Sequence, residues 1–277
     1  MRLDAHQHFW RYNPAEHTWM NDAMAVLKRD YLPADLEPLL RANGFDGCIA
    51  VQARQSLEET RWLLELAAQN SFVKGVVGWV DLRSPELDAQ LAEFRGAKAL
   101  VGVRHIVQDE PDDRFMLGDA FQRGIARLAA HGLVYDVLVY PRQLPAAVEL
   151  VRAFPDQPFV LDHIAKPLIS EGRMEPWAAD LRALAACGNV NCKLSGMVTE
   201  ATWRGWKPAD FRPYLDVVLE AFGPERLMIG SDWPVCTLSA EYGEAIGLVK
   251  DYIAALSASE QAAILGGNCA WVYGIDG

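Results

Sequence analysis

The sequence feature that most constrains the fold is an alternation of short apolar runs with helical patterns along the whole chain. The apolar runs are rich in valine and isoleucine, and polar residues rarely interrupt them, which is typical of parallel strands covered on both faces. They lie at residues 2–10, 47–52, 73–80, 99–104, 133–139, 158–163, 189–194 and 226–230. Eight parallel strands with helices between them close into a (β/α)8 TIM barrel. We therefore expect an α/β fold in which residues 1–277 form a single TIM-barrel domain.

Helical patterns occupy the intervals between these runs. Apolar side chains recur along one side of each pattern and charged side chains along another, as in helices that cover a sheet. Ser56 and Ser257 each stand three residues before a glutamate, which is the signature of a capping box at the start of a helix. The expected helices are residues 57–69, 85–94, 117–131, 143–153, 176–187, 208–222, 240–255 and 257–265.

The charge and the cysteines narrow the class of function. A net charge of -11 disfavours nucleic acid as a partner, because phosphate binding needs a basic surface. No apolar run approaches the ~18 residues that indicate a membrane span, and the start of the chain carries a candidate site motif in place of a secretory leader. The five cysteines are scattered and include no C-x-x-C pair, a pattern of reduced proteins. We expect a cytoplasmic protein that binds neither nucleic acid nor membrane.

Two histidines stand at the end of the first apolar run. In a strand, residues i and i+2 point to the same face, so His6 and His8 would project side by side. Two neutral imidazoles that converge in this way can hold a divalent metal or polarise a substrate oxygen. A pair of merely hydrogen-bonded histidines would show the same spacing.

Two further polar residues follow apolar runs later in the chain. The run at residues 227–229 leads into Gly230-Ser231-Asp232, and Pro234 then prevents further pairing in the sheet. His163 follows the run at residues 159–161 in the same way. Because the carboxyl ends of all barrel strands lie on one face, we expect these side chains to share a cavity with His6 and His8.

Together these motifs carry a family resemblance. D-x-H-x-H at residues 4–8, D-H-I-A-K-P at 162–167 and G-S-D-W-P at 230–234 resemble the amidohydrolase superfamily, and more narrowly its lactonase-like branch, amidohydrolase family 2. Each motif alone is weak, but their order along essentially the whole chain is specific. The resemblance implies that Asp232 is the general base, that His6 and His8 bind metal, and that His163 is the catalytic histidine of the sixth strand.

The chain departs from the metal-rich members of that superfamily at the fourth and fifth strands. The fourth strand ends in Arg104 and His105 where those members have a bridging lysine or glutamate, which argues against a two-metal site. The resemblance then leaves His6, His8 and Asp232 for a single ion, most simply zinc, with His163 as a further candidate ligand. Some lactonase-like members work without metal and use the same imidazoles and arginines as electrophiles. The alternative to a zinc enzyme is therefore one in which zinc is dispensable or absent.

Polar and aromatic residues on or just past the strand ends are candidates for substrate contacts. Arg104 ends an apolar strand, where a permanent charge is costly unless it binds an anion, polarises a carbonyl or forms a buried salt bridge. Trp10 begins a loop with several aromatic residues that could stack on a sugar ring or simply pack. Ser195 and Gly196 could donate backbone amides. The remaining candidates are Gln52, Arg54, Trp79, His105 and Lys166.

The function that the resemblance implies is hydrolysis of a small lactone, such as a fucono-, rhamnono- or galactonolactone. Water would attack the carbonyl, Asp232 would take its proton, and the imidazoles or a zinc ion, with Arg104, would stabilise the oxyanion. Related barrels with similar motifs decarboxylate unsaturated acids, so a lyase is one alternative, and a catalytically inactive barrel that binds a metabolite is another. The expected partner is a small-molecule lactone, and a homo-oligomer is compatible with the sequence.

Overall fold

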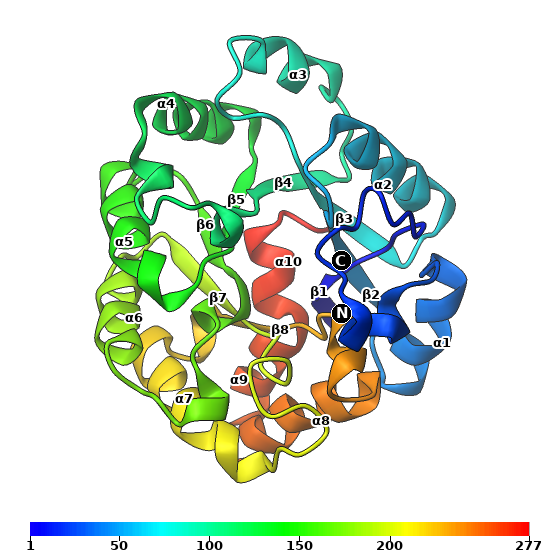
Figure 1. Cartoon of the computed structure of the whole chain (residues 1–277), viewed down its shortest axis with the longest axis vertical. Helices are drawn as coiled ribbons and strands as arrows, with labels where there is room; N and C mark the ends of the chain where they lie inside the picture. The colour runs from blue at the N-terminus through cyan, green and yellow to red at the C-terminus, as the bar shows by residue number, and fades with distance from the viewer. Residues whose placement is uncertain (277) are drawn as a thin grey trace.

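The computed structural model describes residues 1–276 and shows a single sheet of parallel strands in the order β1 to β8 (Figure 1). The strands are β1 (Leu3–Gln7), β2 (Gly47–Val51), β3 (Val73–Gly78), β4 (Leu100–His105), β5 (Val134–Val137), β6 (Phe159–Leu161), β7 (Val190–Leu194) and β8 (Leu227–Ile229). The segment after β8 returns to β1, where the His8 amide donates to the Trp233 carbonyl at 2.7 Å and the Asp232 amide donates to the His6 carbonyl at 2.8 Å. These bonds close the ring, and the predicted TIM barrel is confirmed.

Helices surround this ring of strands, except the last one, which lies across its middle (Figure 1). They are α1 (Pro33–Ala42), α2 (Leu57–Gln69), α3 (Leu87–Glu93), α4 (Asp119–Leu128), α5 (Leu144–Ala153), α6 (Trp177–Ala185), α7 (Pro208–Phe222), α8 (Tyr242–Ile253), α9 (Ala258–Ala262) and α10 (Asn268–Val272). Helix α1 was not predicted, because prolines at residues 33 and 38 mask its pattern, although Leu36 and Leu40 pack against the barrel. Within residues 1–276, no helix combines the length and the apolar character needed to cross a bilayer.

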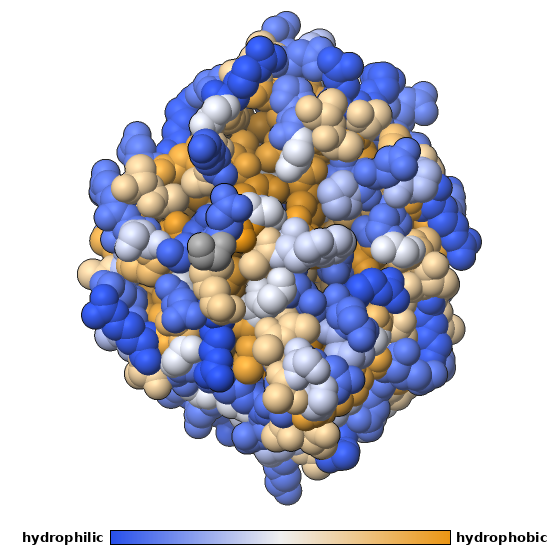
Figure 2. Space-filling model, turned by 180° about the vertical axis from the view of Figure 1, so that it is seen from behind, coloured by the Kyte–Doolittle hydropathy of each residue, from blue (hydrophilic) through white to orange (hydrophobic). Residues whose placement is uncertain are grey.

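The apolar residues form two layers, one between the strands and the helices and one inside the barrel. The inner layer includes Leu3, Val134 and Met228, and it is completed by Cys269 and Tyr273 from the C-terminal segment. Helix α10 accordingly lies across the middle of the ring in Figure 1. Figure 2 shows the opposite side, where hydrophilic side chains cover most of the surface and apolar ones show mainly in a hollow in its upper part. The C-terminal segment therefore closes the end of the barrel that contains the strand N-termini.

A local irregularity in β1 turns both histidines toward the barrel interior. Leu3 and Ala5 belong to the inner layer, so strict alternation would place His6 on the outer face. The register of β1 against β2 shifts between Asp4 and Gln7, and the His6 amide donates to the Asp4 carboxylate at 3.2 Å. Such a bulge changes the side of the sheet to which the following side chains point.

The start of α2 confirms one half of the predicted capping box. The Ser56 hydroxyl accepts from the Glu59 amide at 3.0 Å. The Glu59 carboxylate, however, turns back and accepts from the amides of Ala53 at 3.1 Å and Arg54 at 2.6 Å, which fixes the turn after β2. Burial raises the pKa of Glu59 to about 7 despite these hydrogen bonds and the nearby charge of Arg54.

This carboxylate makes stability depend on pH. The folded pKa of Glu59 lies above the ordinary value of 4.5, so its contribution is fully present below pH ~4.5 and is lost as the pH rises through about 7. The shift in the pKa of Glu59 corresponds to about 3 kcal/mol of unfolding free energy. We expect Glu59→Gln to abolish this pH-dependent loss. The difference in unfolding free energy between the variant and wild type should therefore shift by about 3 kcal/mol in favour of the variant as the pH rises from 5 to 8. Urea unfolding at both pH values measures it. Glu65→Gln, at an exposed position of α2, is the matched control, and an equal response of the two variants would contradict the prediction.

Candidate active site

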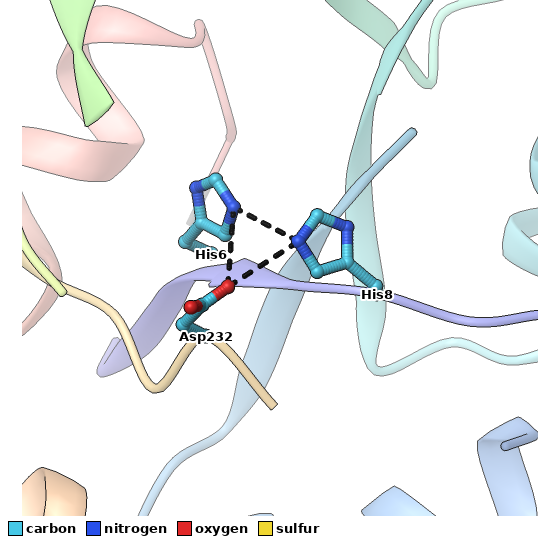
Figure 3. Close-up of side chains that lie close together, drawn as sticks. All are labelled: His6, His8 and Asp232. Carbon is cyan, nitrogen blue, oxygen red and sulfur yellow. Dashed lines mark hydrogen bonds and ion pairs between the residues drawn. The ribbon is translucent and has the colours of Figure 1, made fainter. Parts of the chain in front are cut away.

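Three histidines and one aspartate meet at the C-terminal ends of the strands. The Nε2 atoms of His6 and His8 lie 3.2 Å apart, and Asp232 Oδ1 lies 3.8 Å from the first and 3.4 Å from the second (Figure 3). The Nε2 atom of His163 also lies 3.8 Å from Asp232 Oδ1. All four residues are at most 5% exposed. The structure thus brings together the four residues on which the sequence motifs centred, and their catalytic roles remain a proposal.

Asp4, the first residue of the D-x-H-x-H motif, fixes the turn that carries Asp232. Its carboxylate accepts from the Ser231 amide at 2.9 Å, from the Ser231 hydroxyl at 2.6 Å and from the Tyr242 hydroxyl at 3.1 Å. Asp232 itself has a φ of 56°, a left-handed conformation that Asp and Asn adopt more readily than most residues. Buried hydrogen bonds to a carboxylate therefore hold the Asp232 backbone in place.

His163 is presented by an unusual left-handed turn after β6. Four consecutive residues, His163 to Lys166, have φ values between 48° and 60°, each of which is strained for a residue other than glycine. The Trp177 indole stabilises the turn by donating to the Ile164 carbonyl at 2.7 Å. The His163 Nδ1 atom is hydrogen-bonded to the Ser195 hydroxyl at 2.9 Å, so Nε2 is the ring nitrogen that faces Asp232.

Two imidazoles of the cluster, those of His6 and His163, are neutral at neutral pH, and the carboxylate of Asp232 is ionised. Burial lowers the pKa of His163 to about 4 and holds the pKa of His6 well below its ordinary value. Burial alone would raise the pKa of Asp232, but the facing imidazoles, His163 first, outweigh it and hold that pKa below its usual range. Metal binding and proton acceptance both require these charge states.

The donor atoms fit one metal ion. Two ligands of a tetrahedral zinc ion at 2.0–2.1 Å lie roughly 3.3 Å apart, close to the observed separations of 3.2 to 3.8 Å. A second group of potential ligands, His6, Asp162 and His163, shares His6 with the group formed by His6, His8 and Asp232. In this second group, the Asp162 carboxylate already forms an ion pair with Arg104 at 2.9 Å. The geometry therefore supports a single ion.

We therefore expect the protein to bind no more than one zinc ion per chain. His8→Ala removes one ligand and should weaken zinc binding by at least ~10-fold, while His131→Ala, at an exposed histidine that follows α4, should leave it unchanged. Elemental analysis gives the stoichiometry and titration against a chromophoric chelator gives the affinity. Two tightly held equivalents per chain would contradict the single-ion arrangement.

A buried network of charges lies directly beneath the cluster. Lys193 is fully buried, and its Nζ atom lies 2.5 Å from Asp136 Oδ2 and 3.0 Å from Asp162 Oδ1. Asp162 also pairs with Arg104, and Tyr273 donates to Asp136 at 2.9 Å. The sequence interpretation did not single out Lys193 or Asp162. A lysine inside the apolar strand V-N-C-K-L was the available signal, since a buried ammonium needs paired anions.

Arg104 and Gln52 belong to this network. The Arg104 guanidinium donates to Asp162 Oδ2 at 2.9 Å and to Gln52 Oε1 at 3.0 Å, and its Nη1 atom lies 3.3 Å from His6 Nε2. The buried salt bridge that the sequence left open for Arg104 is therefore formed. Its position beside His6 still allows it to add positive potential at the cluster.

Lys166 and Trp10 border the cluster. Lys166 follows His163 in the left-handed turn, and its Nζ atom lies 3.9 Å from the carboxylate of Glu200, a residue that the sequence interpretation missed. Trp10 is buried, its ring centroid lies 6.5 Å from that of His8, and its indole donates to the Arg29 carbonyl at 2.9 Å. Trp10 thus packs as part of a wall next to His8.

Three predicted contact residues are not brought to the cluster. His105 points outward, stacks on Phe115 and bonds to Glu110 at 2.7 Å, because the side chains of Arg104 and His105 alternate across β4. Arg54 pairs with Glu16. The backbone of Trp79 is held by the Thr60 hydroxyl of α2, and no hydrogen bond or ring stacking joins its side chain to the four clustered residues.

With this fold and site, the chain belongs to the amidohydrolase family, whose sequence profile matches residues 3–275. It is 48% identical to an L-fucono-1,5-lactonase of Burkholderia multivorans, with 99% of this chain and 96% of that relative covered. It is 40% identical to an L-fucono-1,5-lactonase of Burkholderia ambifaria, with the same shares of 99% and 96% covered. A crystal structure of an amidohydrolase from Burkholderia multivorans with bound zinc superimposes with a TM-score of 0.96, at 48% identity and with 100% of both chains covered. The expected family is confirmed.

Proposed function

We propose that this protein hydrolyses a sugar-acid lactone and that L-fucono-1,5-lactone is its substrate. The observation that carries the proposal is the ionised Asp232 within 3.4 to 3.8 Å of three imidazoles, at the functional face of the barrel. The names of two relatives that align over nearly the full chain support the choice of substrate.

In the proposed reaction, Asp232 accepts a proton from the water that attacks the lactone carbonyl. A carboxylate with a low pKa is a weak base toward free water. The attacking water becomes strongly acidic as its oxygen bonds to carbon, however, so that even a weak base then accepts the proton. Asp232 returns this proton to the ring oxygen as the C–O bond breaks, and the product is the open hydroxy acid.

Positive potential and hydrogen-bond donors at the cluster stabilise the oxyanion that forms on the carbonyl oxygen. Arg104 lies within 3.3 Å of His6 Nε2, and its guanidinium is always charged. Removing one such donor typically lowers kcat by ~10²–10³. His163 is held by Ser195 on the other side of Asp232, where it positions the water and the leaving oxygen.

We further propose zinc as the ion that this site takes up, held by His6, His8 and Asp232 and bordered by His163. When bound, it would supply Lewis-acid polarisation of an oxygen and lower the pKa of a water. The fit of the donor distances supports this choice, as does the bound zinc in the similar Burkholderia multivorans structure.

The surroundings of the cluster suit a polyhydroxylated ring. Trp10 and Trp19 pack edge to face with their centroids 6.2 Å apart, and Trp19 is 40% exposed. Trp10 is buried behind it, so the Trp19 indole is the one that offers an apolar surface to the face of a sugar ring. Lys166 and Glu200 offer a donor and an acceptor for hydroxyl groups at its edge.

Incubation of the purified protein with a panel of lactones tests the proposal, with acid release followed by a pH indicator. The panel contains L-fucono-1,5-lactone, other five- and six-membered aldonolactones, and an unsubstituted six-membered lactone. We expect the highest kcat/KM for a sugar-acid lactone, in the enzymatic range of ~10⁴–10⁸ M⁻¹s⁻¹. Release of CO₂ from unsaturated acids without lactone turnover would identify a decarboxylase, and inactivity toward both classes would leave a binding protein.

A further inference from the structure

The tautomer of His8 is fixed by the strand next to it. Its Nδ1 atom lies 2.8 Å from the Val51 carbonyl oxygen. Because a carbonyl only accepts, Nδ1 carries the proton, and in the neutral form of the ring Nε2 then presents a lone pair. That lone pair faces His6 Nε2 at 3.2 Å, where it can accept a proton from His6 or coordinate a metal.

The other ring nitrogen of His6 faces two competing groups. Lys193 Nζ lies 3.2 Å from His6 Nδ1 in hydrogen-bonding geometry, whereas Asp162 Oδ1 lies 3.3 Å away and makes no hydrogen bond. An ammonium only donates and a carboxylate only accepts. A hydrogen bond from Lys193 therefore requires the lone pair on Nδ1, and a hydrogen bond to Asp162 requires the proton there.

The ammonium of Lys193 donates hydrogen bonds to Asp136 and to His6, and the Asp162 carboxylate lies beside it as an ion-pair partner without accepting one. Asp136 Oδ2 lies at 2.5 Å, Asp162 Oδ1 at 3.0 Å and His6 Nδ1 at 3.2 Å. Arg104 Nη1 lies 3.3 Å from the opposite nitrogen of His6 in hydrogen-bonding geometry, and this contact opposes that of Lys193, because a guanidinium only donates. The Arg104 contact is the longer of the two, and Nη1 already donates to Asp162 Oδ2 at 2.9 Å.

We propose that Lys193 holds His6 in the tautomer that carries its proton on Nε2, and that it thereby weakens metal binding at the cluster. In this state a chain of hydrogen bonds runs in one direction, from Lys193 to His6, from His6 to His8 and from His8 to the Val51 carbonyl. A metal on His6 Nε2 requires the proton to move to Nδ1, where Asp162 can accept it and Lys193 loses an acceptor. Lys193 thus favours the metal-free site, and Asp162 favours the metal-bound one.

Zinc affinity tests this role without any substrate, so the result does not depend on the proposed lactonase activity. Lys193→Met combined with Asp136→Asn removes one cation and one anion together and leaves Asp162 paired with Arg104. We expect this double variant to bind zinc ~10-fold or more tightly than wild type, in line with the effect of groups that contact metal ligands. Tyr273→Phe is the matched control, because it removes a 2.9 Å hydrogen bond to Asp136 and leaves the contact between Lys193 and His6 intact. It should bind zinc as wild type does.

A ¹⁵N NMR spectrum of the metal-free wild-type protein, labelled on histidine, provides a second readout that needs no stable variant. The His6 signals are assigned by their loss in His6→Gln. We expect an unprotonated Nδ1 and a protonated Nε2, exchanged in the double variant. A proton on Nδ1 in the metal-free wild type would overturn the proposal, and so would equal zinc affinities of the double variant and wild type. If the double variant does not fold, the wild-type spectrum alone decides.

Discussion

Asp232→Asn is expected to lower kcat for lactone hydrolysis by ~10²–10⁴, the usual loss when a positioned base is removed. Asparagine has nearly the same shape as aspartate and keeps one acceptor oxygen, but it cannot take up a proton. It also tolerates the φ of 56° at this position. The fold should therefore be retained, and the loss should fall on kcat more than on KM, because the proton moves in the transition state.

Steady-state kinetics across a range of lactone concentrations separate kcat from KM, and thermal unfolding checks the fold. Zinc content is measured alongside, because Asp232 is also a candidate ligand, and both proteins are compared after metal removal and after zinc saturation. A variant that keeps more than about a tenth of the wild-type kcat in both states, against the loss expected for a base, would remove Asp232 from the proposed role. His163 would then be the next candidate for the base.

Gly196→Ala is expected to lower kcat by ~10²-fold through His163 alone. Gly196 has a φ of +64°, and a Cβ added there would lie 2.4 Å from His163 Nδ1 and 2.6 Å from its Cγ. The ring must therefore move, and it would lose its hydrogen bond to Ser195 and its place beside Asp232. Displacements of ~1 Å in a site can cost 10²-fold in rate.

Gly132→Ala and Gly172→Ala separate this effect from backbone strain. These glycines have φ values of +68° and +63°, and a Cβ at either would meet nothing within 4 Å. All three variants should lose ~1–2 kcal/mol of stability from the left-handed conformation, but only Gly196→Ala should lose activity. Wild-type kcat in Gly196→Ala would show that the position of His163 does not matter for the reaction.

The order of the strands and the clustered residues could be predicted because their signals are local. Each strand is a short apolar run, and Asp232 and His163 come directly after such runs. Parallel strands in a barrel place these ends on one face regardless of the helices between them. Both histidines at the end of β1 point into the shared cavity, as predicted. Strict alternation from Leu3 would have placed them on the outer face, and the bulge between Asp4 and Gln7 is what turns them inward.

The groups beneath and behind the cluster could not be predicted in the same way, because their partners are distant in sequence. Lys193 on β7 meets Asp136 on β5, and Tyr273 reaches the same carboxylate from the C-terminal segment, 137 residues away. Asp4 binds Ser231 across 227 residues. His105 was predicted at the site because it adjoins Arg104, but neighbours in a strand point to opposite faces.

The central claim is that water attacks the carbonyl carbon of a lactone at this site, and hydrolysis in H₂¹⁸O tests it most directly. Mass spectrometry of the product counts the label, and the isotope shift in its ¹³C NMR spectrum locates it. The mechanism predicts one ¹⁸O atom on the carboxylate carbon, formed far faster by wild type than by Asp232→Asn. Label on the ring-hydroxyl carbon, or a rate with L-fucono-1,5-lactone and its relatives no greater than in buffer, would contradict it.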